Sequence, residues 1–268
     1  MPLAVCATPI GNLDDVTLRV LAELRAADVV LCEDTRRTRK LLERHGITAL
    51  LQSYHEHNEA KRTAEVLPRL EAGDRVALVS DAGMPAVSDP GARLIGAALE
   101  AGVDVTVLPG PSAIETALVV SGFGTDRFQF LGYLPRGEGE RRALWDTIAR
   151  WPHAVVAFES PQRVGAVLAS LAEALPERRV AVCRELTKRF EEVVRGPVNE
   201  VVERFSEGVK GEITLVIGPA EVSPEIDEDS AAAAVGELVA AGSSRRNAAD
   251  VVSRLTGVAR NRLYRRSL

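Results

Sequence analysis

RVALVSDAGMPAVSDPG, residues 75–91, is the stretch whose pattern decides the fold. Its four apolar residues at 76–79 form a run of the length expected of a buried parallel strand. Polar and small residues at 80–83 end this run, and Pro85 stiffens the segment that follows. Ligands of open α/β sheets bind at the carboxyl ends of the strands. The stretch therefore predicts either a ligand-binding loop or a plain strand–loop–helix connection, with Pro90 at the first helical position.

Strand and helix patterns alternate along the rest of the chain. Residues 1–120 contain five apolar runs separated by helical patterns, which predicts βαβ units and a largely parallel sheet. Residues 121–220 contain a second set, in which a strand at 190–194 follows another strand too closely to be parallel. Residues 221–268 read as an acidic connector and a basic helical extension. We therefore expect an α/β protein with a mainly parallel N-terminal sheet, a mixed C-terminal sheet and a helical extension.

The composition is that of a soluble globular chain. Of 268 residues, 46% are hydrophobic and 26% are charged, and no apolar run approaches the roughly 20 residues that span a bilayer. The first residues, MPLAVCATPIGN, carry no basic flank, and their apolar run is too short for a signal peptide. We expect a cytoplasmic protein with no membrane partner.

The cysteines and histidines give no metal-binding pattern. Cys6, Cys32 and Cys183 are far apart and each lies in an apolar run, which is typical of buried thiols. The four histidines form no HExxH motif, and there is no CxxC. We expect no metal.

Charge is unevenly distributed over a chain whose net charge is −5. The connector is acidic, with Glu221, Glu225, Asp227, Glu228 and Asp229. The tail beyond it is basic, with Arg245, Arg246, Arg254, Arg260, Arg262, Arg265 and Arg266. Such a tail indicates either a local contact with a polyanion or a solvated helical surface.

Five loops follow the strands expected in the first domain, and all should open on one edge of its sheet. They are TPIGN, EDTR, YHEHNE, SDAGMP and PGPS, and FESP follows a strand of the second domain. Two domains that meet at such an edge form a cleft suited to a small ligand. There is no GxGxxG, no GxxxxGK[ST] and no GxSxG motif. Spacing alone thus predicts a two-domain α/β enzyme with an unspecified small ligand.

The ordered set of motifs narrows this prediction. TPIGNLDD, CEDTRRTRKLL, HEHNE, VALVSDAGMPAVSDPG, PGPSA, FESPQR and GEITLVIG extend from Leu3 to about Gly218. Together they resemble the bacterial 16S (small-subunit) ribosomal RNA cytidine 2′-O-ribose methyltransferases, which belong to the tetrapyrrole methylase superfamily. The tail RNRLYRRSL resembles the C-terminal helical extension of that family.

The resemblance implies S-adenosylmethionine as methyl donor, 16S ribosomal RNA or the small ribosomal subunit as acceptor, and a homodimer. The residues that it assigns to the donor pocket are Ile10, Asp81, Ala82, Gly83, Met84, Ser112, Ala113, Phe158 and Thr214.

Transfer to a ribose hydroxyl needs the reactants held in line and is helped by a group that accepts the hydroxyl proton. Asp34 with Arg36 is the first pair to test, and His57 is a further candidate. Glu33, Glu59 and Glu159 remain open as alternative bases, and each of these residues could instead make only a structural loop contact.

Two other functions stay open at this point. One is a methyltransferase acting on a precorrin-type tetrapyrrole, although a small tetrapyrrole does not need a basic tail. The other is a non-catalytic protein that binds RNA or the ribosome, although the SDAGMP and PGPS loops argue against loss of the donor site.

Overall fold

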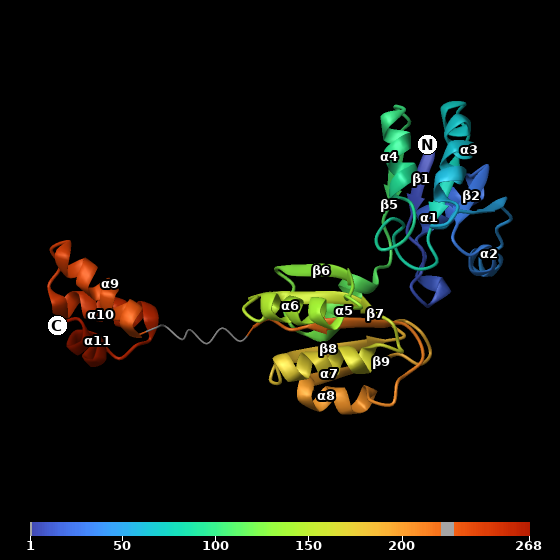
Figure 1. Cartoon of the computed structure of the whole chain (residues 1–268). Coiled ribbons are helices and arrows are strands. Elements are labelled where there is room, and N and C mark those ends of the chain that lie inside the picture. The colour runs from blue at the N-terminus through green and yellow to red at the C-terminus, as the bar shows by residue number, and fades with distance from the viewer. Residues whose placement is uncertain (1, 221–227) are drawn as a thin grey trace. The chain divides into compact units, whose positions relative to one another are not determined.

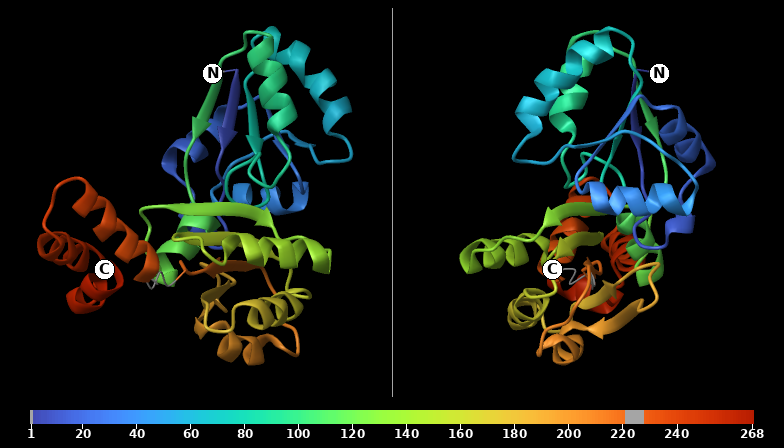
Figure 2. Two further views of the ribbon diagram at one scale, coloured as in Figure 1. Left: turned by 60° about the vertical axis from the view of Figure 1, so that its left-hand side comes forward. Right: turned by 90° about the vertical axis from the view of Figure 1, so that its right-hand side faces the viewer.

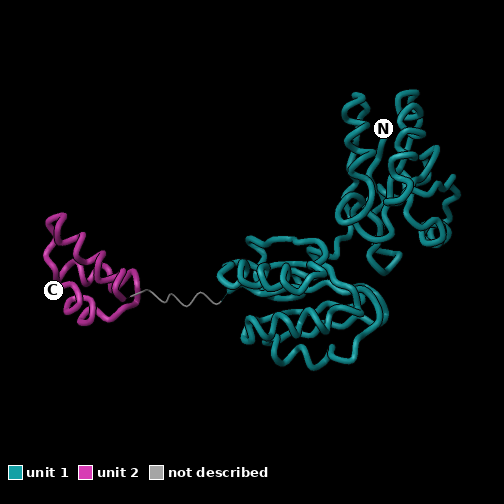
Figure 3. The backbone as a smooth tube through the Cα atoms, in the orientation of Figure 1, with its two compact units in different colours: residues 1–220 teal, residues 221–268 magenta. Residues whose placement is uncertain are grey.

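Two compact units make up the chain in the computed structural model, which describes residues 2–220 and 228–268. Residues 1–220 form unit 1 and residues 221–268 form unit 2 (Figure 3). The connector residues Glu221, Glu225 and Asp227 lie outside the described residues. Unit 1 contains two sheets, and the domain boundary expected after residue 120 stays a prediction.

The first sheet is parallel throughout, as the alternation of apolar runs predicted. Its strands are ordered β3-β2-β4-β1-β5. Leu3 of β1 lies opposite Val76 of β4 on one side and Val105 of β5 on the other. The strands are β1 (Leu3–Cys6), β2 (Val29–Cys32), β3 (Leu51–Ser53), β4 (Val76–Val79) and β5 (Val105–Leu108).

Helices cover both faces of this sheet. Alternate strand residues point to opposite sides, and since β1, β2 and β4 are apolar throughout, both faces present side chains to be buried. Ala4 and Cys6 pack against α1 and α2, whereas Leu3 packs against α3 and α4 (Figures 1 and 2). The elements are η1, a 3₁₀ turn (Leu13–Asp15), α1 (Leu18–Ala26), α2 (Thr35–Arg44), α3 (Glu59–Glu71) and α4 (Ala92–Glu100).

The second sheet is mixed, which confirms the second part of the fold prediction. Its order is β6-β7-β10-β8-β9, and β6 pairs with β7 in parallel while the other pairs are antiparallel. The strands are β6 (Phe128–Tyr133), β7 (Ala154–Glu159), β8 (Arg179–Arg184), β9 (Glu192–Pro197) and β10 (Ile213–Ile217).

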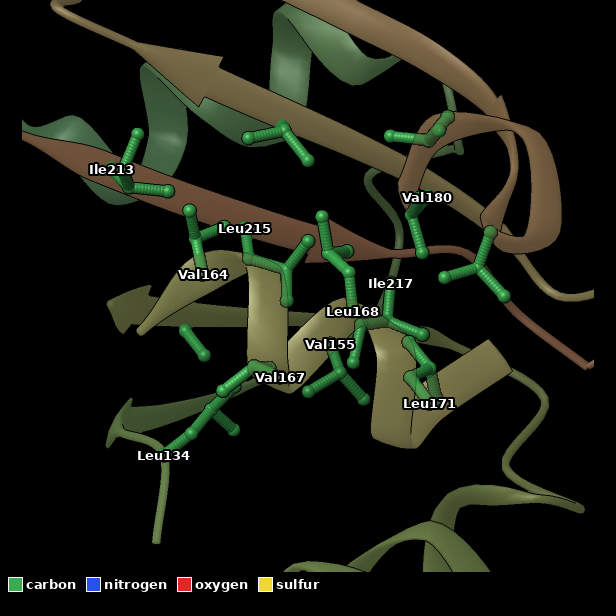
Figure 4. Packing of buried hydrophobic residues seen from close by; sticks show 14 of the residues in the cluster. Leu134, Val155, Val164, Val167, Leu168, Leu171, Val180, Ile213, Leu215 and Ile217 are labelled. Atoms are coloured by element: carbon green, nitrogen blue, oxygen red, sulfur yellow. The ribbon is translucent and has the colours of Figure 1, made fainter. Parts of the chain in front are cut away.

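One helix covers one face of the second sheet and three cover the other. Ala117 and Leu118 of α5 (Ala113–Ser121) pack against β7, β8 and β10. On the opposite face, Leu168 and Leu171 of α7 pack against Leu215 (Figure 4). This face is covered by α6 (Glu138–Ile148), α7 (Val164–Ala174) and α8 (Val198–Phe205).

Unit 2 is a small helical unit with its own core. Val235, Ala249 and Leu263 are fully buried and bring α9 (Glu228–Ala240), α10 (Arg245–Thr256) and α11 (Arg260–Arg266) together. Arg262 forms a 2.8 Å ion pair with Glu228, and Arg266 forms one with Asp229. Arg254 and Arg260 lie 3.8 and 3.9 Å from Asp250, so four of the tail arginines are engaged within the described part of the unit. None of the helices in the described ranges is both long and apolar enough to cross a membrane.

The start of α4 differs from the prediction. Pro90 does not take the first helical position, because the helix begins at Ala92 with Gly91 as its N-cap. Gly91 has φ = 142°, a value that side-chain-bearing residues rarely adopt. The segment before it therefore belongs to a long loop, whose contacts are described below.

Two helical glycines give opposite expectations for stability. A Cβ at Gly165 of α7 would lie 2.6 Å from the carbonyl oxygen of Phe205, whereas a Cβ at Gly96 of α4 meets nothing within 4 Å. Gly165→Ala should lower the free energy of unfolding by about 1–3 kcal/mol through overpacking. Gly96→Ala should raise it by about 0.5–1 kcal/mol through helix propensity. Urea denaturation of both variants checks this, and a stabilised Gly165→Ala would show that α7 and α8 are not in close contact.

Candidate active site

A cleft of about 590 Å³ opens between the two sheets of unit 1. Loops that follow β1, β4 and β5 line it from the carboxyl edge of the first sheet, and residues of β6, β7, β8 and β10 line it from the second. The nine residues that the resemblance assigns to the donor all line this cleft: Ile10, Asp81, Ala82, Gly83, Met84, Ser112, Ala113, Phe158 and Thr214. The structure thus brings them together from five separate segments, and their roles stay predictions.

The loop after β4 is fastened to the loop after β1. The Thr8 N–H donates to the Gly83 carbonyl at 2.8 Å, and the Gly83 N–H donates to the Thr8 carbonyl at 3.0 Å. The Thr8 hydroxyl donates to the Ser80 carbonyl at 3.0 Å. Gly83 has φ = 79°, in the left-handed region that glycine adopts without strain. These bonds hold two lining segments in fixed positions.

The same loop contains backbone strain. Ala86 and Ser88 have φ values of 66° and 61°, which cost about 1–3 kcal/mol each for residues other than glycine. Such conformations persist where the surrounding structure holds them and are common at ligand sites. The loop is therefore shaped for more than the connection of β4 to α4.

Asp81 is positioned by its neighbours as well as exposed to the cleft. The Asp34 N–H donates to Asp81 Oδ1 at 2.9 Å, and Arg37 Nε lies 3.5 Å from Oδ2. The side chain of Asp81 is 21% exposed. Asp81 therefore presents a negative charge in a fixed orientation.

Asp89 is a cleft residue that the sequence reasoning missed, because its DPG context indicated only the start of a helix. Its pKa is raised to about 7, chiefly by burial and in addition by the nearby carboxylates of Glu33 and Asp81. A hydrogen bond with Ser80 acts in the opposite direction. A carboxyl group with this pKa exchanges its proton near neutral pH.

The three residues predicted to be catalytic are not among the described residues that line the cleft. The carboxylate of Asp34 is the N-cap of α2 and forms a 2.9 Å ion pair with Arg36. The hydrogen bonds from Arg36 lower the pKa of Asp34 to about 2, which makes it a weak proton acceptor. The exposed His57 lies edge-on to His55, with 6.0 Å between ring centroids. Asp34 reaches the cleft only through its backbone bond to Asp81.

The alternative bases have different environments. Glu59 Oε1 accepts the Gly91 N–H at 3.0 Å and the Tyr54 hydroxyl at 3.1 Å, so it supports the start of α4. Glu159 lines the cleft, but its buried carboxylate pairs with Arg163 at 3.2 Å. Burial raises the pKa of Glu33, and Asp81 adds to this increase.

A chain of ion pairs crosses from one side of the cleft to the other. Arg37 lies 3.5 Å from Asp81 and 3.8 Å from Glu212, and Lys188 lies 2.8 Å from both Glu212 and Glu185. These ion pairs join α2 and the loop after β4 to the loop that follows β8 and to the residue that precedes β10. The cations at this end of the cleft are thus already paired.

In the part of the chain that the structure describes, no three His, Cys, Asp or Glu side chains are arranged to hold a metal ion. The three cysteines are buried thiols. Cys183 lines the cleft, and burial raises the pKa of its thiol to about 12. It therefore stays protonated at neutral pH.

Comparison with known proteins identifies the family. Residues 2–202 match the model of the tetrapyrrole (corrin/porphyrin) methylases. A protein of Mesorhizobium japonicum named ribosomal RNA small subunit methyltransferase I is 43% identical over 99% of this chain and 91% of its own length. A protein of the same name from Mycobacterium tuberculosis is 44% identical over 98% of this chain and 93% of its own length.

Solved structures agree on the fold. The methyltransferase CobJ matches with a TM-score of 0.63 and 22% identity, over 81% of this chain and 94% of that chain. Uroporphyrin-III C-methyltransferase from Thermus thermophilus, complexed with S-adenosylhomocysteine, matches with a TM-score of 0.57 and 21% identity, over 81% and 96%. The resemblance read from the loop motifs is confirmed: this chain belongs to the tetrapyrrole methylases, a family of methyltransferases.

Proposed function

We propose that the chain transfers a methyl group from S-adenosylmethionine to the 2′-hydroxyl of a cytidine ribose in small-subunit ribosomal RNA. The observation that carries this proposal is the cleft, which is lined by all nine residues that the resemblance assigns to the donor. The relatives of the chain along nearly its full length are named ribosomal RNA methyltransferases. The alternative acceptor is a precorrin-type tetrapyrrole.

The cleft fits the donor in size and chemistry. Its volume lies within the range of roughly 300–1,000 Å³ of small-molecule sites. Ile10, Met84 and Phe158 offer apolar surface for the adenine ring and the aliphatic carbons. Asp81 and Asp89 place negative charge where a cationic sulfonium would bind. When bound, S-adenosylmethionine supplies an electrophilic methyl group on this sulfonium.

The residues of this chain would act mainly by positioning. Asp81, oriented by the Asp34 N–H, would hold a polar group of the donor. The exposed ring of Tyr133 contacts Phe158 edge-on, at 5.9 Å between centroids, and bounds the cleft on the side of the second sheet. Holding donor and hydroxyl in line supplies a large part of the acceleration of such a transfer.

Asp89 is the residue to which we assign the hydroxyl proton. It lines the cleft, and its pKa of about 7 leaves it ready both to accept a proton and to release it to water. Asp34 would then act as a positioning residue through its backbone. Arg36, as the partner of Asp34, and His57, as a candidate base, stay predictions.

Unit 2 supports an RNA acceptor. A hollow of about 400 Å³ is lined by Arg246, Arg260, Asn261, Tyr264 and Arg265. Arg262 and Arg266 are paired with acidic residues of α9, and Arg260 lies 3.9 Å from Asp250. Arg246 and Arg265 are therefore the arginines of the hollow placed to contact phosphates. Tyr264 is 41% exposed and offers a ring for stacking on a base.

A homodimer in the cytoplasm belongs to the same proposal. β5 is an edge strand of the first sheet, and its Val107 is 54% exposed, which gives an apolar surface that a second copy can cover. Ribosomal RNA as acceptor supports the cytoplasmic location.

Methyl-labelled S-adenosylmethionine tests the acceptor. We expect small ribosomal subunits or 16S RNA to become labelled, and nuclease digestion to yield a cytidine that carries the label on its 2′-oxygen. Parallel reactions with precorrin substrates should stay unlabelled. Label in a tetrapyrrole, or on a base carbon or nitrogen, would overturn the proposed reaction.

Removing the charge of Asp81 should weaken donor binding. Asp81→Asn keeps an oxygen that can accept the Asp34 N–H, so we expect about a 10- to 100-fold rise in donor Kd by calorimetry from loss of a charge-assisted contact. Asp28→Asn is the matched control, because Asp28 also accepts a backbone N–H, from Arg75 at 2.8 Å, at the amino end of the same sheet. Equal donor affinity in the two variants would exclude Asp81 from the site.

The pH profile should report Asp89. Below a pH of about 7 its carboxyl is protonated and cannot accept the hydroxyl proton, so kcat/KM should fall about tenfold per pH unit. With the donor bound, its sulfonium stabilises the carboxylate, so the kcat profile should break at lower pH. Asp89→Asn should lower kcat about 10²- to 10⁴-fold and abolish this pH dependence.

Stability gives the control for that variant. A carboxyl whose pKa is raised in the fold binds more protons folded than unfolded, so its contribution to stability falls as pH rises from about 4 to 7. Asp89→Asn should therefore have a higher Tm than the parent at pH 8. An unchanged pH profile in this variant would assign the proton to another group.

A further inference from the structure

The loop between β8 and β9 starts in the wall of the cleft and ends on an exposed aromatic ring. Leu186 is buried and lines the cleft, whereas Phe190, four residues further on, is 66% exposed. Four residues span at most about 14 Å, so both residues are within reach of one bound strand of nucleic acid. The ring therefore lies beside the site of transfer without being part of it.

This loop is held in one conformation. Glu185 and Thr187 have positive φ values of 53° and 64°. The Asn12 N–H donates to the Thr187 hydroxyl at 2.9 Å, and the Thr187 N–H donates to Glu191 at 2.6 Å. The Lys188 ammonium donates to Glu185 and to Glu212, each at 2.8 Å. A strained backbone that is fastened at several points indicates that the exposed tip is positioned for a contact.

Most of the charged side chains around the Phe190 ring are paired with one another. Lys188 is paired with Glu185 and Glu212, and Arg184 is paired with Glu192 at 2.8 Å. Arg189 lies within 4.0 Å of no carboxylate oxygen among the described residues, and its guanidinium is 5.6 Å from the centroid of the Phe190 ring. The tip thus offers one unpaired cation and one exposed π face.

We propose that Phe190 stacks on an unpaired nucleobase of the RNA acceptor, next to the nucleotide that enters the cleft, while Arg189 contacts the adjoining phosphate. This inference rests on the proposed function. Stacking on an aromatic side chain stabilises any unpaired base, because every base has a π face. It compensates for the stacking that a neighbouring base loses when the target nucleotide leaves the helix.

An exposed phenylalanine could also be covered by a second copy of the chain. The unpaired Arg189 beside the ring favours nucleic acid, because a phosphate neutralises this cation while the base covers the ring. In an interface between copies, the guanidinium would need a carboxylate from the partner. The experiment below distinguishes the two occupants by the oligomeric state.

The test compares variants of the full chain for RNA binding, donor binding and mass in solution. Phe190→Ala should raise the Kd for 16S RNA, and the KM in methyl transfer, about 5- to 100-fold, with donor Kd unchanged. Phe190→Trp keeps an aromatic ring, so its Kd for RNA and its KM should equal those of the parent chain. Leu99→Ala is the matched control, because Leu99 is 60% exposed near the end of α4, at the opposite edge of the first sheet, and should change neither value.

Arg189→Gln gives a readout that a purely structural role would not move. The slope of log Kd against log salt should fall by about 0.7, the value for one phosphate of a single strand. Unchanged RNA affinity in Phe190→Ala would overturn the stacking contact, and so would weaker RNA binding that accompanies a change from dimer to monomer. Failure of the parent chain to methylate RNA it binds would instead overturn the proposed reaction and leave the binding comparison valid.

Discussion

The site depends on the reciprocal backbone hydrogen bonds between Thr8 and Gly83. Five parallel strands bring their carboxyl ends to one edge, but loops at such an edge are free to diverge unless something joins them. Here the two bonds join the loops after β1 and β4, and Gly83 adopts the positive φ that this geometry requires. The polar and apolar parts of the cleft are thereby fixed together before any ligand binds, which reduces the cost of ordering them.

One loop carries two aspartates whose environments differ. Asp81 accepts the Asp34 N–H and lies near the Arg37 guanidinium, so its carboxylate is held in one orientation. Burial, with additional contributions from the carboxylates of Glu33 and Asp81, raises the pKa of Asp89 to about 7. Two aspartates eight positions apart thus have different surroundings, because the backbone between them adopts the strained conformations of Ala86 and Ser88.

Much of this site could be predicted from the sequence, and what could not has a physical reason. Apolar runs followed by Gly, Pro and Asp placed the loops at the correct edge, and motif resemblance assigned residues such as Met84 and Phe158, which do line the cleft. Asp34 does not line the cleft, and the sequence could not show this because a carboxylate after a strand looks the same whether it faces a ligand or caps a helix. Asp89 was missed because its DPG context indicated only the start of a helix, whereas its raised pKa comes from burial in the fold and from the carboxylates of Glu33 and Asp81.

Electrostatics then constrains how an RNA could approach. The chain carries a net charge of −5, its cleft contains several carboxylates, and Arg37 and Lys188 beside the cleft are already paired. A polyanion is therefore not attracted by the transfer site itself. Attraction has to come from cations without a carboxylate partner among the described residues, such as Arg189 and, in unit 2, Arg246 and Arg265. The acidic cleft suits a cationic donor, whereas unpaired arginines suit a phosphate backbone, so the donor and the RNA backbone are attracted by different groups of the chain.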